Sequence, residues 1–253
     1  MAVKDWKKAL VARRALEKRA KDEHTRAQLA LERARAADLH PRTALVIARD
    51  KASAKLRLRR RQVAEAEKAV KAISGRAPKL SPEITVISPN RSSRNGVKPR
   101  IIVLHITVSR NMAGITDLRG MAEYGARPSS KVSWHILVDG EGFDARCVPD
   151  AEKAWTQAAY NSVALSIEQI QPADMPREKW LSDYRPQLET VAGWIAKWSV
   201  THGIPIRHST SSGVCQHRDL GAAGGGHADV GPGYPFDWVL ERARKYALAL
   251  ERA

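Results

Sequence analysis

The stretch RIIVLHITV, residues 100–108, decides the fold of this chain. Its apolar run is nearly continuous, a pattern typical of a strand buried on both faces of a mostly parallel sheet. His105 lies near the carboxyl end of the run, where open α/β sheets gather their ligands. A histidine in an apolar strand is also often a core residue with satisfied hydrogen bonds. The stretch therefore predicts a central strand and makes His105 a candidate functional residue, with both roles open.

Segments on either side predict a mixed sheet with flanking helices. Three runs predict further strands: EITVIS (residues 83–88), KVSWHILV (131–138) and NSVALSIEQI (161–170). Helical periodicity predicts three helices: DLRGMAEYG (117–125), PQLETVAGWIAKWSV (186–200) and WVLERARKYALAL (238–250). We expect Pro186 in a first helical turn and Asp237 as the cap of the closing helix. Residues 81–253 are therefore predicted to form one α/β domain, with a mixed central β-sheet flanked by helices.

The first 80 residues have a different pattern. Residues 5–37 and 43–73 have helical periodicity and contain neither glycine nor proline. The tract LHPRT (residues 39–43) separates them, because a proline ring cannot continue the helical hydrogen bonds. Two helices of similar length with a short break predict an antiparallel hairpin. SGRAPKLSP (residues 74–82) has the composition of a linker, which predicts a domain boundary near residue 80.

Most of the positive charge belongs to this hairpin. Residues 1–80 hold 23 of the 43 Lys and Arg residues and 9 of the 27 Asp and Glu residues, so they carry +14 of the net charge of +16. Such a surface attracts nucleic acid, an anionic membrane surface or anionic wall polymers, although Lys and Arg are also ordinary residues of a solvated helix. No base-reading motif accompanies the charge, so we expect no specific nucleic-acid partner. We also expect no signal peptide, no membrane span and no disulfide framework.

The stretch CQHRDLGAAGGGHADVGPGYPF, residues 215–236, carries the other candidate residues. His217 follows the short apolar tract GVC, and Asp229 lies beyond a glycine-rich loop that can fold back toward it. Together with His105, these side chains are a plausible catalytic zinc set, with water in the fourth position. A closed structural site would need four protein ligands, usually several cysteines. Cys215 remains an alternative ligand, since residues i and i+2 of a strand point the same way; otherwise it is a small buried residue.

Four motifs occur in order along the chain: HIT (residues 105–107), VSWH (132–135), SIEQ (166–169), and HRDL (217–220) followed by HADVGPGYPF (227–236). Together they resemble the zinc-dependent N-acetylmuramoyl-L-alanine amidases, the type 2 amidase family. That family includes phage endolysins and is related in fold to the peptidoglycan recognition proteins. The resemblance covers residues 84–245 and does not reach the basic helices. It implies Zn²⁺ as cofactor, bacterial peptidoglycan as partner, and cleavage of the amide bond between N-acetylmuramic acid and the L-alanine of the stem peptide.

The resemblance also assigns roles to individual residues. It makes His105, His217 and Asp229 the zinc ligands and Glu168 the catalytic glutamate. Trp134 stands where a second branch of the family has a catalytic tyrosine, so the chain resembles the glutamate branch. His227 replaces the lysine that often steadies the oxyanion in relatives, and we expect it to donate a hydrogen bond there.

Three more positions follow from the resemblance. Relatives commonly have a histidine after the tryptophan of the tract EKAWTQAAYNS, where this chain has Thr156. Trp155 and Asn161 are then expected to contact substrate with Trp134, although a core role for Trp155 is an equal alternative. His135 is expected to make a supporting hydrogen bond rather than to line the cleft.

The expected biology is that of a phage endolysin. It is made in the host cytoplasm without a signal peptide and acts at the bacterial cell wall after release by a holin. The basic residues 1–80 are expected to bind anionic wall polymers or the membrane surface. Two alternatives remain: a non-catalytic peptidoglycan-binding module, and a nucleic-acid-binding protein driven by the basic helices.

Overall fold

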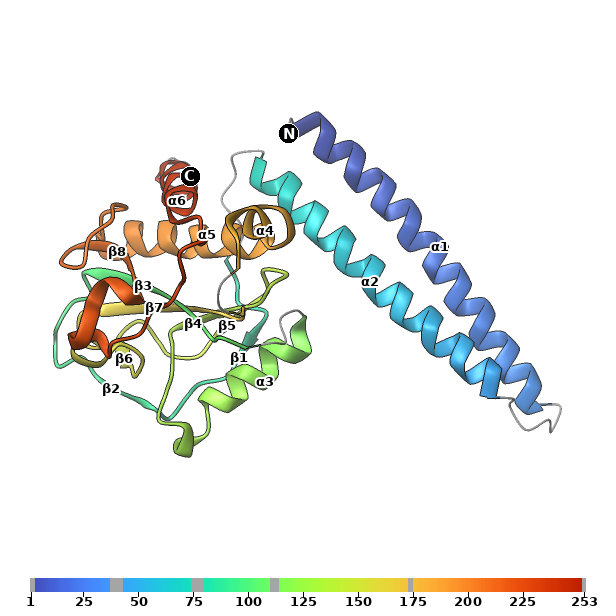
Figure 1. Ribbon diagram of the computed structural model, residues 1–253, viewed down its shortest axis with the longest axis horizontal. Helices are drawn as coiled ribbons and strands as arrows, with labels where there is room; N and C mark the ends of the chain where they lie inside the picture. The colour runs from blue at the N-terminus through green and yellow to red at the C-terminus, as the bar shows by residue number, and fades with distance from the viewer. Residues whose placement is uncertain (1–2, 37–42, 74–79, 110–113, 173–174, 252–253) are drawn as a thin grey trace. The chain divides into compact units, whose positions relative to one another are not determined.

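The computed structural model describes residues 3–36, 43–73, 80–109, 114–172 and 175–251. The chain divides into two compact units, Met1–Ser74 and Gly75–Ala253 (Figure 1). Most of the predicted break LHPRT and of the predicted linker SGRAPKLSP lies outside the described residues. Among the described residues, no helix has the length and apolar character that a membrane span needs.

The first unit is the predicted pair of helices, α1 (Val3–Ala36) and α2 (Thr43–Ile73), which lie side by side in Figure 1. Two ion pairs give their direction: Lys55 Nζ lies 2.6 Å from Glu23 Oε2, and Arg60 Nε lies 3.7 Å from Glu17 Oε1. Later residues of α2 thus face earlier residues of α1, so the helices are antiparallel, as predicted. Such exposed pairs contribute little to stability, at most about 1 kcal/mol each.

The second unit is built on a six-stranded mixed sheet in the order β1-β5-β4-β7-β3-β8. Its strands are β1 (Ile84–Thr85), β3 (Ile101–Ile106), β4 (Ile136–Val138), β5 (Asp144–Arg146), β7 (Ala164–Gln169) and β8 (Gly213–Gln216). Only the β4–β5 pair is antiparallel. A separate antiparallel pair joins β2 (Arg91–Ser93) to β6 (Glu152–Ala154). Strand β3 lies in the interior of the large sheet, as the run RIIVLHITV predicts.

Helices cover the two faces of this sheet unequally. The helices are α3 (Ile115–Gly125), α4 (Arg177–Asp183), α5 (Arg185–His202) and α6 (Phe236–Leu250), with 3₁₀ turns η1 (Pro128–Ser130), η2 (Ala158–Tyr160) and η3 (His217–Gly224). Figure 1 shows α5 and α6 on one side of the sheet and α3 on the other. The large core lies under α5 and α6, where Leu104 and Ile167 of the sheet pack with Trp194 and Val239. The sheet face on the side of α3 is covered less extensively by helices and can therefore carry a functional site.

The structure corrects several of the sequence-based elements and their boundaries. EITVIS and KVSWHILV form strands only at Ile84–Thr85 and Ile136–Val138. Strands β2, β5 and β6 and helix α4 were not predicted, because segments of three to seven residues carry too little periodicity. Pro186 lies in the first turn of α5 as expected. Asp237 does not cap α6: it lies inside the first turn, and its carboxylate binds Arg177 at 2.6 Å.

Candidate active site

The register of two parallel strands places the first pair of site residues. On β3, Ile102, Leu104 and Ile106 face the core under α5 and α6, so His105 points to the opposite face. His105 of β3 stands directly opposite Glu168 of β7. The two side chains therefore lie next to each other on the sheet face away from α5 and α6.

The glycine-rich segment brings in the other two residues. His217 begins the turn η3 directly after β8, which pairs with β3. The chain then folds back, and the amide of Arg218 donates a 2.8 Å hydrogen bond to the carbonyl of Asp229. The amide of Ile106 donates a 3.2 Å hydrogen bond to Asp229 Oδ2. Backbone hydrogen bonds thus hold Asp229 beside the end of β3.

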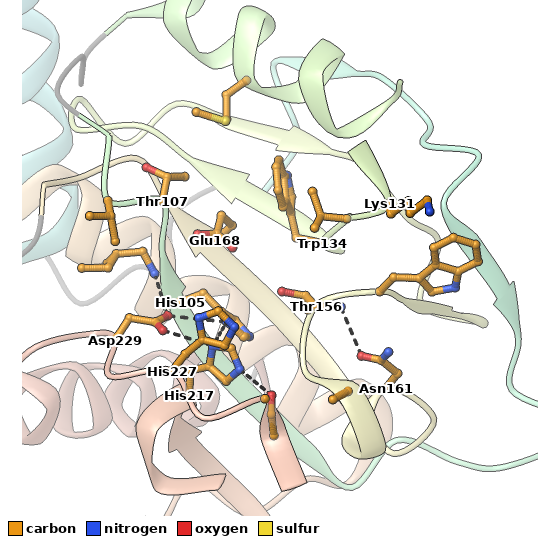
Figure 2. A pocket seen from close by; sticks show the side chains of 18 of the residues that line it. His105, Thr107, Lys131, Trp134, Thr156, Asn161, Glu168, His217, His227 and Asp229 are labelled. Atoms are coloured by element: carbon orange, nitrogen blue, oxygen red, sulfur yellow. Dashed lines mark hydrogen bonds and ion pairs between the residues drawn. The ribbon is translucent and has the colours of Figure 1, made fainter. Parts of the chain in front are cut away.

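His105, His217 and Asp229 converge on one point (Figure 2). His105 Nδ1 lies 3.0 Å from His217 Nδ1 and 3.6 Å from Asp229 Oδ2, and His217 Nδ1 lies 3.1 Å from Asp229 Oδ1. Two ligands of a tetrahedral zinc ion, each about 2.0–2.1 Å from the metal, are separated by about 3.3 Å. The three donors therefore have both the chemistry and the spacing that zinc requires.

The surroundings of the two imidazoles shift their pKa values in opposite directions. His217 Nε2 lies 2.9 Å from the carbonyl of Gly224 and donates to it, so the lone pair of the neutral ring is on Nδ1. Burial and the nearby His217 lower the pKa of His105 to about 3. Burial also disfavours the charged form of His217, but hydrogen bonds to Asp229 and Gly224 outweigh it and raise its pKa. Burial by itself would raise the pKa of Asp229. The hydrogen bond with His217 and the nearby charges lower this pKa instead, so Asp229 remains a carboxylate.

Glu168 differs from Asp229 in its electrostatics. Its side chain is almost completely buried. Burial, and then the negative charge of Asp229, raise its pKa well above the usual value for glutamate. His105, His217 and Asp229 are candidate metal ligands and are called the metal-binding set below. A carboxyl group with a raised pKa next to such a set is suited to accept and return a proton.

These residues open onto one cavity of about 800 Å³. In Figure 2 the metal-binding set lies at one side of this cavity, and Lys131 and Asn161 lie away from it. The predicted residues that line the cavity are His105, Trp134, Trp155, Asn161, Glu168, His217, His227 and Asp229. A volume of this size is within the range of small-molecule binding sites, about 300–1,000 Å³.

The predicted substrate residues have different surroundings. Trp134 is 5% exposed and packs in a second hydrophobic cluster with Leu118 and Leu137. Its ring lies so close to Gly125 that a Cβ atom at that glycine would be 3.1 Å away. Trp155 is 37% exposed, and its Nε1 donates a 3.0 Å hydrogen bond to Ser92, so it is a surface residue of the cavity and not a core residue. Asn161 Oδ1 accepts the amides of Thr156 and Gln157 at 3.1 and 2.8 Å. The loop that carries Trp155 is thereby fixed.

His227 stacks on a metal-binding histidine. Its ring lies 4.7 Å from that of His217, with an angle of 18° between the planes. The ring also lines the cavity. His227 is therefore beside the metal-binding set without being part of it.

Two other sequence candidates lie outside the cavity. Cys215 is fully buried among Ile101 and Val103, and burial raises the pKa of its thiol to about 12, so the alternative of a cysteine ligand is not supported. His135 does not line the cavity, in agreement with the expectation. Its Nδ1 accepts the amide of Ser166 at 3.0 Å, and its Nε2 donates to the carbonyl of Glu152 at 3.0 Å. His135 thus supports the strand that carries the catalytic candidate and contacts no metal-binding residue.

Some cavity residues were not singled out from the sequence. Thr107, Met121, Tyr124 and Lys131 also line the cavity. Thr107 is the last residue of the motif HIT, and Lys131 directly precedes the motif VSWH, so their positions in the sequence were the available signal. Met121 and Tyr124 belong to α3, whose position over the sheet only the tertiary structure reveals.

Comparison with known proteins identifies the family. The Staphylococcus aureus hydrolase AmiA, solved in complex with its ligand, is 21% identical, with a TM-score of 0.55 over 70% of this chain and 87% of that chain. The N-acetylmuramoyl-L-alanine amidase LysC from Clostridium intestinale is 16% identical, with a TM-score of 0.46 over 65% of this chain and 99% of that chain. A search of curated proteins found no match. The family model described as N-acetylmuramoyl-L-alanine amidase (Amidase_2) matches residues 95–233, which include His105, Glu168, His217 and Asp229. Because this match spans more than half of the sequence, the chain belongs to the N-acetylmuramoyl-L-alanine amidase family.

Proposed function

We propose that this protein is a zinc-dependent peptidoglycan hydrolase. It cleaves the amide bond between N-acetylmuramic acid and the L-alanine of the stem peptide. The observation that carries the proposal is the convergence of His105, His217 and Asp229 beside Glu168 in one cavity. Family membership supports the choice of substrate.

Bound zinc supplies the Lewis acidity that amide hydrolysis needs, because it polarises a carbonyl and lowers the pKa of water to about 7. Glu168 takes the proton of the attacking water and returns it to the leaving amine of L-alanine. Its burial keeps bulk water away from this proton and raises its pKa well above the usual glutamate value, which favours holding the proton between the two transfers. General acid–base catalysis of this kind contributes about 10²–10⁴-fold to the rate.

We assign the oxyanion contact to His227. Stacking on His217 limits the rotation of its ring and keeps a nitrogen near the metal-binding set. A hydrogen bond from this ring to the developing oxyanion takes the place of the lysine that is common in relatives. Trp155, Asn161 and Trp134 are the proposed substrate contacts. Trp155 offers an exposed ring face, Asn161 retains an amide group for the peptide, and the largely buried Trp134 forms part of the wall.

Product analysis tests the reaction directly. Purified peptidoglycan is digested with and without a metal chelator, and the new ends are identified by mass spectrometry. We expect free amino groups on L-alanine and intact glycan strands, with no products in the chelator. New reducing sugar ends, or unchanged digestion in the chelator, would contradict the proposal.

We propose that the helical hairpin binds the anionic polymers of the cell wall. The exposed residues of α1 and α2 include Arg14, Lys18, Arg19, Lys21, Arg26, Arg33, Lys51, Lys55, Arg57 and Arg60. Acidic residues in this unit are too few to balance them. Binding between exposed charges weakens with salt, because the screening length falls to about 8 Å at physiological ionic strength.

Charge reversal tests the role of the hairpin in the full-length chain. We expect the variant Lys18→Glu/Lys21→Glu/Arg57→Glu to bind purified walls more weakly at low salt, with the difference lost at high salt. The control Lys98→Glu/Arg119→Glu/Lys179→Glu removes the same charge from exposed positions of the second unit and should bind as the wild type does. Equal loss in both variants would mean that net charge alone matters. Loss of binding to anionic vesicles, but not to walls, would point to a membrane surface instead.

We place this activity in host lysis by a phage, as the resemblance to endolysins implies. The protein would be made in the host cytoplasm and reach the wall after a holin opens the membrane. Co-expression with a holin tests this role. Lysis that needs both proteins is the expected result, and lysis without the holin would exclude it.

A further inference from the structure

The two metal-binding histidines differ in how their outer nitrogens are held. His217 Nε2 donates to the carbonyl of Gly224, which leaves Nδ1 for the metal. His105 Nε2 is buried, and no described residue forms a hydrogen bond of good geometry with it. Histidines that bind metals almost always donate this second N–H to an oxygen acceptor, because that bond sets the tautomer and the ring orientation. An acceptor for His105 is therefore the missing part of the site.

Gln157 is placed to supply this acceptor. Its side chain is completely buried, and neither its amide oxygen nor its amide nitrogen has a hydrogen-bond partner among the described residues. Burial without a partner is costly for both atoms, so a glutamine at such a position needs an explanation. The amide adjoins the ring of His105, where it opposes the lowering of that histidine's pKa by burial. The Nε2 atom of His105 and both polar side-chain atoms of Gln157 thus lack partners, although the two side chains are neighbours.

The backbone around Gln157 is well anchored. Its N–H donates a 2.8 Å hydrogen bond to Asn161 Oδ1, and its carbonyl accepts the amide of Tyr160 at 3.0 Å. The residue stands directly before the turn η2, between Thr156 and Ala158, which both line the cavity. The side-chain torsions of Gln157 can therefore turn the amide oxygen toward the ring while the backbone stays in place.

We propose that Gln157 is the positioning residue of His105. Its Oε1 accepts the hydrogen bond from His105 Nε2–H, so that Nδ1 keeps its lone pair and faces His217 and Asp229. The inference rests on the proposed zinc site and adds to it a residue outside the metal-binding set. Gln157 touches neither the substrate nor the metal, and it acts through the orientation of the ring.

Metal affinity and stability separate this role from a purely structural one. The variant Gln157→Leu keeps the approximate size of the side chain and removes both polar atoms. We expect zinc affinity, measured by competition with a coloured chelator, to fall about 10–100-fold. The melting temperature of the metal-free variant should be unchanged or higher, because two unpartnered buried atoms are gone. Gln157→Glu restores an oxygen acceptor, and we expect zinc affinity to recover to near the wild-type value or above it.

Gln187→Leu is the matched control. Gln187 is equally buried, but its amide donates to the carbonyl of Val138 at 2.9 Å and accepts from Gln171 at 2.8 Å. Its replacement should lower the melting temperature and leave the zinc affinity of the folded protein unchanged. Gln157→Leu is therefore expected to lower zinc affinity without lowering the melting temperature, and Gln187→Leu to lower the melting temperature without changing zinc affinity.

Nitrogen-15 NMR of labelled histidines provides a readout that does not depend on activity. In the zinc-loaded wild type, His105 Nε2–H should exchange slowly with water, and in Gln157→Leu this protection should be lost. Wild-type zinc affinity in Gln157→Leu, or a protected Nε2–H in that variant, would overturn the role of Gln157 alone. Failure of the wild type to bind zinc would instead overturn the proposed function.

Discussion

The variant Asp229→Asn is expected to lose zinc and nearly all amidase activity. Asp229 is the only carboxylate of the metal-binding set, and the low pKa of His105 keeps that ring neutral. Asparagine has the same shape but no charge, so the set then offers a divalent cation no negative ligand. Polarisation of a carbonyl by a metal contributes several kcal/mol, and about 1.4 kcal/mol corresponds to a tenfold change in rate. We therefore expect kcat on peptidoglycan to fall at least about 10³-fold.

Elemental analysis of the purified variant measures the loss of zinc, and release of L-alanine amino groups measures activity. Asp237→Asn is the control, because Asp237 is exposed, pairs with Arg177 and does not line the cavity. The control should keep one zinc ion and full activity. A zinc-loaded and active Asp229→Asn protein would remove the basis of the proposed mechanism.

The variant Glu168→Gln is expected to keep zinc and lose activity. Glu168 lies opposite His105 on the neighbouring strand, but it is not one of the three residues that form the metal-binding set. Its replacement removes the proton acceptor and leaves the metal-binding set intact. We expect kcat to fall about 10²–10⁴-fold, with normal zinc content. Glu123→Gln, an exposed change on α3, is the control and should leave both quantities unchanged.

The same variant has a predictable effect on stability. Burial raises the pKa of Glu168 in the folded state, so the metal-free native protein holds this proton at a pH where the unfolded chain has released it. The free energy of unfolding of the wild type must then decrease as pH rises above the ordinary glutamate pKa of about 4.3. Glutamine does not titrate, so Glu168→Gln avoids this decrease. We expect the metal-free variant to be the more stable protein at pH 7 and equal to the wild type below about pH 4. Urea unfolding at several pH values measures this difference, and a variant that is less stable at pH 7 would contradict the buried environment of Glu168.

Much of the fold was predictable because its main elements are long or strongly apolar. RIIVLHITV predicted β3, since a strand buried on both faces needs a continuous apolar run. The long helices α1, α2, α5 and α6 followed from periodicity over 13 residues or more. Strands β2, β5 and β6 have three residues each, and their pairing partners rather than their composition determine them. Asp237 was misplaced because α6 begins two residues earlier than the capping pattern suggested, with Pro235 at the cap position.

The sequence by itself determined which side chains are available for chemistry: three histidines and two carboxylates in ordered motifs, together with tryptophan and asparagine residues as candidate substrate contacts. The tertiary structure alone decided how they meet. The β3–β7 register sets His105 beside Glu168, and the return of the glycine-rich loop brings Asp229 to the end of β3. Burial raises the pKa of Glu168, whereas the hydrogen bond with His217 and the nearby charges lower the pKa of Asp229. Gln157 illustrates the same division, since nothing in its sequence context distinguishes it. Distances between residues far apart in the chain, and the loss of water around them, arise only when the chain packs.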